Sequence, residues 1–330
     1  MSKASATTRR WTRLLLGAAL LAAAIWSVAA NHQAAAAALQ AIREPDPLWS
    51  LTLPLAVMLT AGCTAASLQL LTNRVIPEGR VHFAEMLSLT FASTLGNVLP
   101  LQAGLVGRVA YQHQVHGIPV AASVLLAVQS TLLTLGAVLW LGVALLLVHA
   151  GRLSWLAAPA SILLLLPALA QAARGASPML RAFAVRFIEV LLSALRIFAA
   201  FALIGRPIDP LSALVFGCAA NAANCVPMVG NGLGIREWVT GLLAPTVAGI
   251  ATPDALAAEL VNRAVELLVF VPAGLAAAPA LVRTLHRAMQ TRRIVPNEAF
   301  ASGISVQIGS LAPQRGVDEP VPNTPASSSD

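Results

Sequence analysis

Long apolar runs dominate the sequence, and most of them have the length of a helix that crosses a membrane. They cover about Leu14–Ala30, Leu48–Leu71, His82–Leu99, Val120–Ala150, Leu153–Ala173, Arg186–Gly205 and Ala255–Leu281. About 20 apolar residues cross the hydrocarbon core, and a helix satisfies its own backbone hydrogen bonds there. The sequence lacks the short alternating segments of a transmembrane barrel. The pattern therefore predicts an all-α polytopic membrane protein.

Two regions are apolar but interrupted by proline and glycine. The first comprises the run His82–Leu99 and the broken stretch that follows it to about Gly117, and the second spans about Leu211–Ile250. If each enters and leaves the membrane on the same side, as a re-entrant helical hairpin, the chain has six full transmembrane helices and two cytoplasmic termini. If both regions cross the membrane, the chain has eight simple spans.

Basic residues favour the arrangement with six spans, because short cytoplasmic loops are enriched in Lys and Arg. Three arginines then face outward, namely Arg43, Arg152 and Arg206. Thirteen basic residues are cytoplasmic: Lys3, Arg9, Arg10, Arg13, Arg74, Arg80, Arg174, Arg181, Arg186, Arg283, Arg287, Arg292 and Arg293.

The predicted organisation has four parts. Residues 1–13 form a cytoplasmic N-terminus, 14–150 a first membrane repeat, 151–281 a second, inverted membrane repeat, and 282–330 a cytoplasmic tail. The tail is rich in Pro and Ser from about Asn297, and we expect it to be largely disordered. Because Arg9, Arg10 and Arg13 precede the first apolar run, a cleaved signal peptide is the alternative interpretation of that run.

Composition agrees with a membrane location. Of the 330 residues, 57% are hydrophobic and 11% are charged, and the mean hydropathy is +0.76. The net charge of +7 sits at the ends of apolar runs, which indicates contact with membrane lipid and not with nucleic acid. Cys63, Cys218 and Cys225 lie in apolar stretches without metal-binding spacing, so no metal site or cofactor is expected.

The two broken regions resemble each other in sequence. The first reads NVLPLQAGLVGR (97–108) and the second NCVPMVGNGLGIR (224–236), and one inserted residue aligns the Asn, Pro, Gly-Leu and Arg of both. Each lies in a half with two apolar runs before it and one after it. Three crossings per half make the second half inverted, and interrupted segments in matching places of inverted halves point to a transporter site near the bilayer midplane.

The interruptions have a chemical consequence. Proline removes a backbone donor, and glycine permits turns that other residues resist. The predicted breaks are at Pro100, Gly104, Gly107, Pro227, Gly232 and Gly234. A helix that restarts after the glycines points its positive end into a cavity, with Arg108 or Arg236 close by. We expect these features to form a receptor for an anion.

Ionisable residues inside apolar stretches are expensive and therefore candidates for function. Arg236, Glu237, Arg263 and Glu266 are the ones we favour, and Arg263 and Glu266 share one helix face. Glu189 and Arg196 are open to either interpretation. Glu85, Glu259, His113 and His116 are expected near the membrane interface.

The strings VPMVGNGLGIREW (226–238) and LPLQAGLVGR (99–108) resemble the flippase-like family of the transmembrane region of lysylphosphatidylglycerol synthase and its stand-alone relatives. The resemblance extends to about Leu281. It implies movement of lipids between leaflets, and roles for Pro100, Gly104, Gly107, Arg108, Pro227, Gly232, Gly234, Arg236, Glu237 and Arg263.

The chain departs from this family in two ways. It lacks the soluble aminoacyl-transferring domain, and it has Gln129-Ser130 where relatives often carry Glu-Arg. It also lacks a phosphate loop, a zinc motif or a recognisable catalytic set, so we do not expect an enzyme.

We therefore expect a flippase or transporter of the bacterial inner membrane. Arg108, Arg236, Glu237, Arg263 and Glu266 would bind the head group of an anionic phospholipid or isoprenoid-linked lipid. The alternative is a membrane scaffold that does not transport, and in either case a lipid- or glycolipid-biosynthetic enzyme is a candidate partner.

Overall fold

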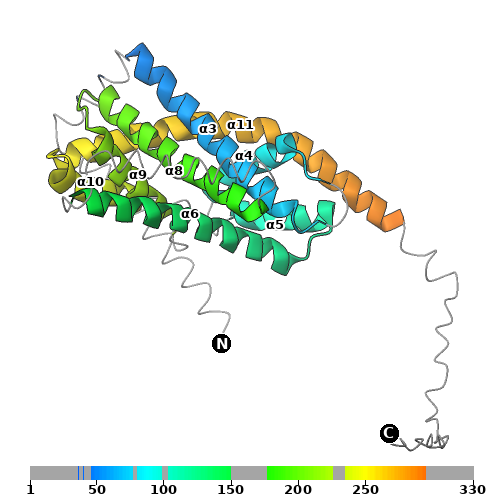
Figure 1. Ribbon diagram of the computed structural model, residues 1–330. Coiled ribbons are helices and arrows are strands. Elements are labelled where there is room, and N and C mark those ends of the chain that lie inside the picture. The colour runs from blue at the N-terminus through cyan, green and yellow to red at the C-terminus, as the bar shows by residue number, and fades with distance from the viewer. Residues whose placement is uncertain are drawn as a thin grey trace, which may run out of the picture. The chain divides into compact units, whose positions relative to one another are not determined.

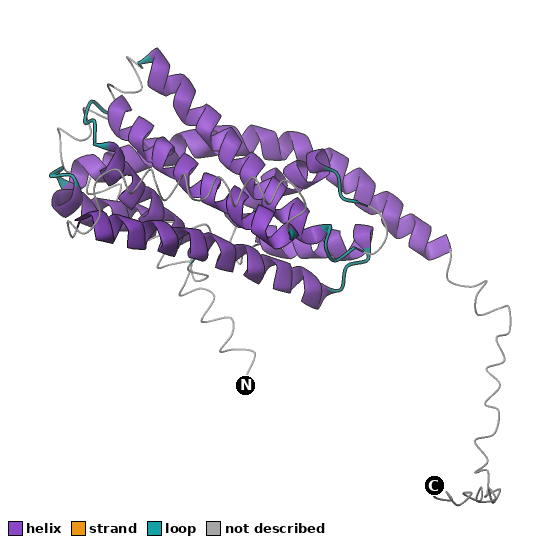
Figure 2. Cartoon of the chain, in the orientation of Figure 1, coloured by secondary structure: helices purple, strands orange, loops and turns teal. Residues whose placement is uncertain are grey.

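The computed structural model describes residues 36, 40, 46–76, 80–98, 103–149, 177–225 and 235–294, and within these residues every regular element is a helix (Figures 1 and 2). The helices are α3 (Pro47–Thr72), α4 (Phe83–Val98), α5 (Ala103–His116), α6 (Val120–His149), α8 (Pro178–Leu203), α9 (Pro210–Asn224), α10 (Ile235–Val247) and α11 (Thr252–Ile294). The chain forms two units, Met1–Met289 and Gln290–Asp330. The predicted first span, the predicted run at 153–173 and the tail from Asn297 lie outside the described residues.

Three of the described helices are long and apolar enough to cross a membrane: α3, α6 over Val120–Leu145, and α11 over Thr252–Gln290. The prediction of a helical membrane protein is confirmed at this level. Helix α8 is as long as α3 but carries four charged side chains, and it is not among the three. Helices α4, α5, α9 and α10 have 13 to 16 residues, fewer than the roughly 20 that a single crossing needs.

Three helices begin with the same local signal, an acidic or hydroxyl side chain followed by proline. Asp46, Ser177 and Asp209 precede the first proline of α3, α8 and α9, and the side chain of each accepts a backbone N–H of the first turn. Such a cap satisfies an amide that has no partner in the helix, and proline at the next position costs no hydrogen bond. The sequence thus fixes these helix starts locally.

The two broken regions fold as antiparallel helical hairpins. In the first, Tyr111 Oη near the end of α5 donates to Glu85 Oε1 at the start of α4, at 2.8 Å. In the second, Ser212 Oγ at the start of α9 donates to the carbonyl oxygen of Val247 at the end of α10, at 3.2 Å. Each hairpin therefore returns the chain to the end from which it came.

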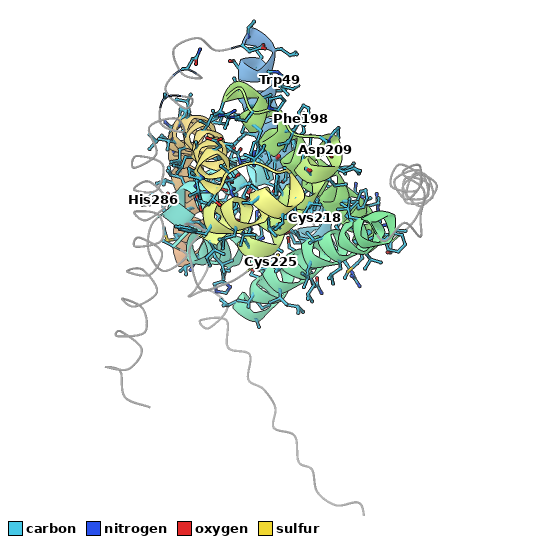
Figure 3. The ribbon with its side chains drawn as sticks, turned by 90° about the vertical axis from the view of Figure 1, so that its left-hand side faces the viewer. Trp49, Phe198, Asp209, Cys218, Cys225 and His286 are labelled. Carbon is cyan, nitrogen blue, oxygen red and sulfur yellow. The ribbon has the colours of Figure 1, made fainter. Side chains whose placement is uncertain are left out.

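Small residues bring the helices of each hairpin region close to their neighbours. A Cβ added at Gly96 of α4 would lie 2.8 Å from Gly104 Cα of α5, and one at Gly217 of α9 would lie 2.8 Å from Ala194 Cα of α8. Helices in membranes often associate through such small residues. Helices α3 and α8 also pack against each other through larger side chains. The rings of Trp49 and Phe198 lie edge to face, with 5.3 Å between their centres (Figure 3).

Helix α11 continues beyond the predicted run, which ends at Leu281, as far as Ile294. The residues after Leu281 are mostly polar but have high helix propensity. Hydropathy therefore predicts where the membrane span ends and not where the helix ends. Its 43 residues extend about 65 Å at 1.5 Å each, roughly twice the hydrocarbon thickness. The helix contains Pro272 and Pro279, which lie on its exposed side.

Candidate anion-binding cavity

A polar cavity of about 250 Å³ lies among the helices of the first unit. Its walls come from α3, α4, α5, α6, α8, α9, α10 and α11, so both predicted halves contribute. The lining residues are Thr60, Ala61, Thr64, Thr90, Ser93, Thr94, Asn97, Arg108, Ser130, Thr131, Thr134, Arg186, Glu189, Ser193, Arg196, Ile197, Ala220, Asn221, Asn224, Cys225, Arg236, Asn262, Glu266 and Phe270.

Hydroxyl and amide side chains reach the cavity because they recur at helical spacing on otherwise apolar helices. On α4 the positions 90, 93, 94 and 97 lie on one face, and on α6 the positions 130 and 134 do so. Thr60, Thr90 and Thr134 donate their hydroxyl protons to the carbonyl four residues earlier, at 2.7, 2.8 and 3.2 Å. Their oxygens remain able to accept hydrogen bonds from the cavity.

Matching positions of the internal repeat meet at this cavity. Asn97 and Arg108 line it from the first hairpin, and Asn224 and Arg236 line it from the second. Asn97 also closes its own hairpin, since its Oδ1 accepts the backbone N–H of Leu105 at 3.2 Å. Motifs about 130 residues apart in sequence are therefore neighbours in space.

Positive charge is in excess on the cavity wall. Among the described lining residues there are four arginines, Arg108, Arg186, Arg196 and Arg236, and two carboxylates, Glu189 and Glu266. Arg108 is partly buried, yet it has no hydrogen bond or ion pair with any other described residue. A guanidinium inside an apolar bundle is costly unless it is paired or solvated, so Arg108 is available to an anion that enters.

Arg186 and Glu189 form one ion pair at the cavity. Arg186 Nη1 lies 2.6 Å from Glu189 Oε2, and Arg186 also donates to Ser67 Oγ at 3.1 Å and to Ser130 Oγ. Glu189 Oε1 accepts a hydrogen bond from Thr64 at 2.9 Å. Glu189 is bonded to α3, and Arg186 is bonded to both α3 and α6, so this pair on α8 links three helices.

A second cluster, here the α8–α10–α11 charge network, contains Arg196, Arg236, Glu259, Asn262, Arg263 and Glu266. Glu266 Oε2 lies 3.2 Å from Arg196 Nη2, 3.2 Å from Arg236 Nη2 and 3.1 Å from Arg263 Nη1. Arg236 also pairs with Glu259 through its Nε. All six side chains are nearly inaccessible to solvent.

Three of the five predicted head-group residues line the cavity: Arg108, Arg236 and Glu266. Arg263 lines a much smaller neighbouring pocket together with Glu266. Glu237 is 1% exposed on α10 and does not line the cavity. The two arginines of the repeat therefore differ in their pairing. Arg108 has no partner among the described residues, whereas Arg236 pairs with two carboxylates.

The predicted hairpin breaks fall in two groups. Pro100, Pro227, Gly232 and Gly234 lie outside the described residues. Gly104 and Gly107 lie inside α5, which begins at Ala103, ahead of both glycines; Arg108 is therefore not in its first turn. Gly104 serves close packing, since an added Cβ would overlap Ser93 O and lie 2.6 Å from Asn97 Oδ1. Arg236 is in the first turn of α10, as expected.

Several charged residues differ from the sequence-based expectation. Arg186, counted among cytoplasmic loop residues, is buried two turns inside α8, because Glu189 and two serines satisfy it. Glu259, expected at the interface, is 1% exposed, because Arg236 provides its counter-charge. Glu85 and His116 are partly exposed and pair with each other at 2.9 Å.

Sequence reasoning passed over most of the cavity wall, including Thr60, Thr64, Ser130 and Asn262. Their signal was present in the sequence: Thr60 and Thr64, Ser130 and Thr134, and Asn262 and Glu266 are each four residues apart. Polar residues at this spacing on an apolar helix mark the face that turns away from lipid.

The described residues contain no group of three or more His, Cys, Asp or Glu side chains that could hold a metal ion. Comparison of the chain with models of known families, with curated proteins and with solved structures gives no match.

Proposed function

We propose that this protein is a lipid flippase or transporter of the bacterial inner membrane, which moves an anionic phospholipid or isoprenoid-linked lipid between the leaflets. The observation that carries the proposal is the meeting of Arg108 and Arg236, from matching positions of two antiparallel hairpins, at one polar cavity with excess positive charge. The resemblance to the flippase-like family points the same way.

The size of the cavity fits a head group and not a whole lipid. A water molecule takes about 30 Å³ of liquid, so 250 Å³ corresponds to about eight waters. A phosphate with a small polar substituent has this size, whereas two acyl chains are several times larger. In this proposal the acyl chains stay in the bilayer while the head group passes between the hairpins.

Arg108 is the proposed primary ligand of the phosphate. Its guanidinium has no acidic partner among the described residues, and the charge of Arg186 acts on it from nearby. Planar, bidentate donors suit phosphate oxygens. Arg236 contributes positive potential while it donates a hydrogen bond to Glu266 and forms an ion pair with Glu259.

The proposed topology has six spans, two inverted repeats and cytoplasmic termini. The antiparallel course of both hairpins supports re-entrant segments over crossing ones. Burial of Arg186 removes one residue from the thirteen basic residues assigned to the cytoplasm, and twelve against three still favours this orientation.

The test uses the full chain in liposomes that contain phosphatidylglycerol with a fluorescent acyl chain. A membrane-impermeant reductant bleaches the label in the outer leaflet only. We expect bleaching well beyond half with the unaltered protein and bleaching that slows at half with Arg108→Gln. Arg181→Gln is the matched control, because Arg181 is an exposed arginine in the first turn of α8.

Equal bleaching beyond half in all three proteins would show that Arg108 does not act on the lipid. Bleaching that stops at half with the unaltered protein would refute transport of this lipid and favour the scaffold, which predicts no lipid movement at all.

A further inference from the structure

Three polar side chains between α10 and α11 are buried and incompletely bonded. Glu237, Thr240 and Glu259 are 1%, 0% and 1% exposed. One oxygen of each, Glu237 Oε2, Thr240 Oγ1 and Glu259 Oε2, has no hydrogen-bond partner among the described residues. None of the three side chains lines the cavity, so the proposed head-group site does not explain them.

Positive charge near the two carboxylates is limited. Arg236 pairs with Glu259 and its charge also acts on Glu237. The third carboxylate around Arg236, that of Glu266, already has Arg196 and Arg263. Among the described residues, Arg236 is therefore the one cation in direct contact with this pair, through Glu259, at a place with almost no exposure to solvent.

The neighbouring helices add no further direct ion pair among the described residues, but the charge of Arg196 also acts on Glu259. From α11 the charged groups are Arg263 and Glu266, and from α8 Arg196 reaches Glu259 through Asn262, at 3.1 and 3.2 Å. Helix α9, which packs against α10, has Cys218 as its one titratable side chain. Negative charge at the pair thus exceeds the positive charge in direct contact with it.

The charge of Glu237 acts on Glu259. Two buried carboxylates that feel each other's charge cannot both ionise without a large cost, and the pair then binds a proton as a unit. Burial without hydrogen bonds adds to this cost, because an ionised carboxylate loses its hydration. The positive N-terminal end of α10, next to Glu237, offsets only part of this cost of ionisation.

We propose that Glu237 and Glu259 form an occluded proton-binding site, a carboxyl pair that takes up one proton and releases it when the contact between α10 and α11 opens. Protonation converts one carboxylate to a neutral carboxyl group. A metal cation fits less well, since Ca²⁺ or Mg²⁺ takes about six oxygen ligands and three oxygens are free here.

The proton changes the charge that the cavity presents. With one carboxyl neutral, the charge network becomes more positive by one unit, and it touches the cavity through Arg196, Arg236 and Glu266. Proton binding and anion binding then favour each other, and this coupling is reciprocal. The site itself is independent of the proposed function, whereas its coupling to lipid movement rests on that function.

Infrared spectroscopy of the purified full chain in lipid tests the site directly, because a protonated carboxyl has a carbonyl stretch that an ionised carboxylate lacks. We expect this band at neutral pH, and we expect Glu237→Gln and Glu259→Gln each to remove or shift it. Glu237→Asp should keep a displaced band, which separates loss of the group from loss of folding. Glu85→Gln, at the partly exposed pair with His116, should leave the band unchanged.

A band that is absent from the unaltered protein, or unchanged in both glutamine variants, would overturn the proton site. The liposome assay with an imposed pH difference tests the coupling, and we expect a rate of bleaching that changes several-fold with the gradient and becomes independent of it in Glu237→Gln. A rate independent of the gradient in the unaltered protein would overturn the coupling. A protein that keeps the band and moves no lipid would refute the proposed function and support the proton site.

Discussion

Removal of the negative charge of Glu266 is the sharpest test of the α8–α10–α11 charge network. In Glu266→Gln the side chain keeps its shape, but Arg196, Arg236 and Arg263 lose the negative charge of the carboxylate whose Oε2 lies 3.1 to 3.2 Å from each of them. Of the carboxylates in contact with these arginines, Glu259 alone remains. Breaking one buried ion pair costs about 3–5 kcal/mol, and here three guanidiniums lose a shared partner.

This cost is large enough to measure as a thermal shift. At about 2–4 °C for each kcal/mol, the midpoint of unfolding should fall by on the order of 10 °C. Intrinsic tryptophan fluorescence of the purified protein in lipid reports the transition, and the chain has six tryptophans.

The matched control is Glu85→Gln. Glu85 also pairs with a basic residue, His116 at 2.9 Å, but its side chain is 26% exposed. Partly exposed pairs contribute less than about 1 kcal/mol, so its midpoint should fall by a few degrees at most. Equal shifts for the two variants, or a rise for Glu266→Gln, would refute the view that the network holds α8, α10 and α11 together.

Three further predictions concern packing, capping and head-group choice. Gly104→Ala should destabilise the protein by about 1–3 kcal/mol, because its Cβ would meet the backbone of α4, whereas Gly107→Ala, with no atom within 4 Å of its Cβ, should leave the unfolding midpoint unchanged or raise it slightly. Asp209→Ala should cost about 1 kcal/mol as a lost helix cap. Burial raises the pKa of Asp209, but hydrogen bonds from Ser212 and Leu211 lower it by more, so the folded pKa is below the ordinary value. The stabilisation by this cap is therefore present above the unfolded pKa of about 3.9 and is lost as pH falls through the folded pKa. A pH titration of the unfolding midpoint should show this loss in the unaltered protein and not in Asp209→Ala. Two unlabelled lipids can be compared as competitors of labelled phosphatidylglycerol: phosphatidylglycerol itself and a lipid whose head group carries an added amine. The amine lipid should compete several-fold less well, because arginines already bind the cavity carboxylates. Stronger competition by the amine lipid would contradict this assignment of the charges.

Local signals explain why much of the helical framework is predictable. The apolar runs that predict spans at 48–71 and 120–150 correspond to α3 and α6. Helix α3 is one residue longer at each end, and α6 begins at the predicted residue 120 and ends one residue earlier than predicted. Caps and prolines such as Asp46-Pro47 define helix starts without any tertiary contact. The matching Asn and Arg of the two broken regions also predict neighbours in space, and both pairs line the cavity.

Partner choice among charged residues is what the sequence could not supply. Arg186 looks like a loop cation because it opens an apolar run, and only the approach of α3 and α6 gives it Ser67 and Ser130. Glu259 looks interfacial because it is close to the start of α11, and only the fold of α10 brings Arg236 to it. Contacts between distant segments decide these cases, and spacing along one helix predicts only the pairing of Arg186 with Glu189, three residues later.

The prolines of α11 have a mechanical consequence. Pro272 and Pro279 cannot donate to the carbonyls of Leu268 and Leu275, so the exposed side of this helix lacks two of its backbone hydrogen bonds. The segment before Pro272 carries the buried charges and is held by them. The segment after it meets α4 at Gly274, where an added Cβ would lie 3.1 Å from the carbonyl oxygen of Phe91.

Because Pro272 donates no hydrogen bond to Leu268, α11 can bend at this point without losing a backbone hydrogen bond there. Phe270, two residues earlier, lines the cavity and packs on Phe91 at 5.6 Å between ring centres. A change of tilt at this point widens or narrows the space beside α4 while the charged segment stays in place. In the proposed transporter, the flexibility that alternating access requires would therefore lie in α11, whose segment before Pro272 holds the buried charges and whose segment after it lies against α4.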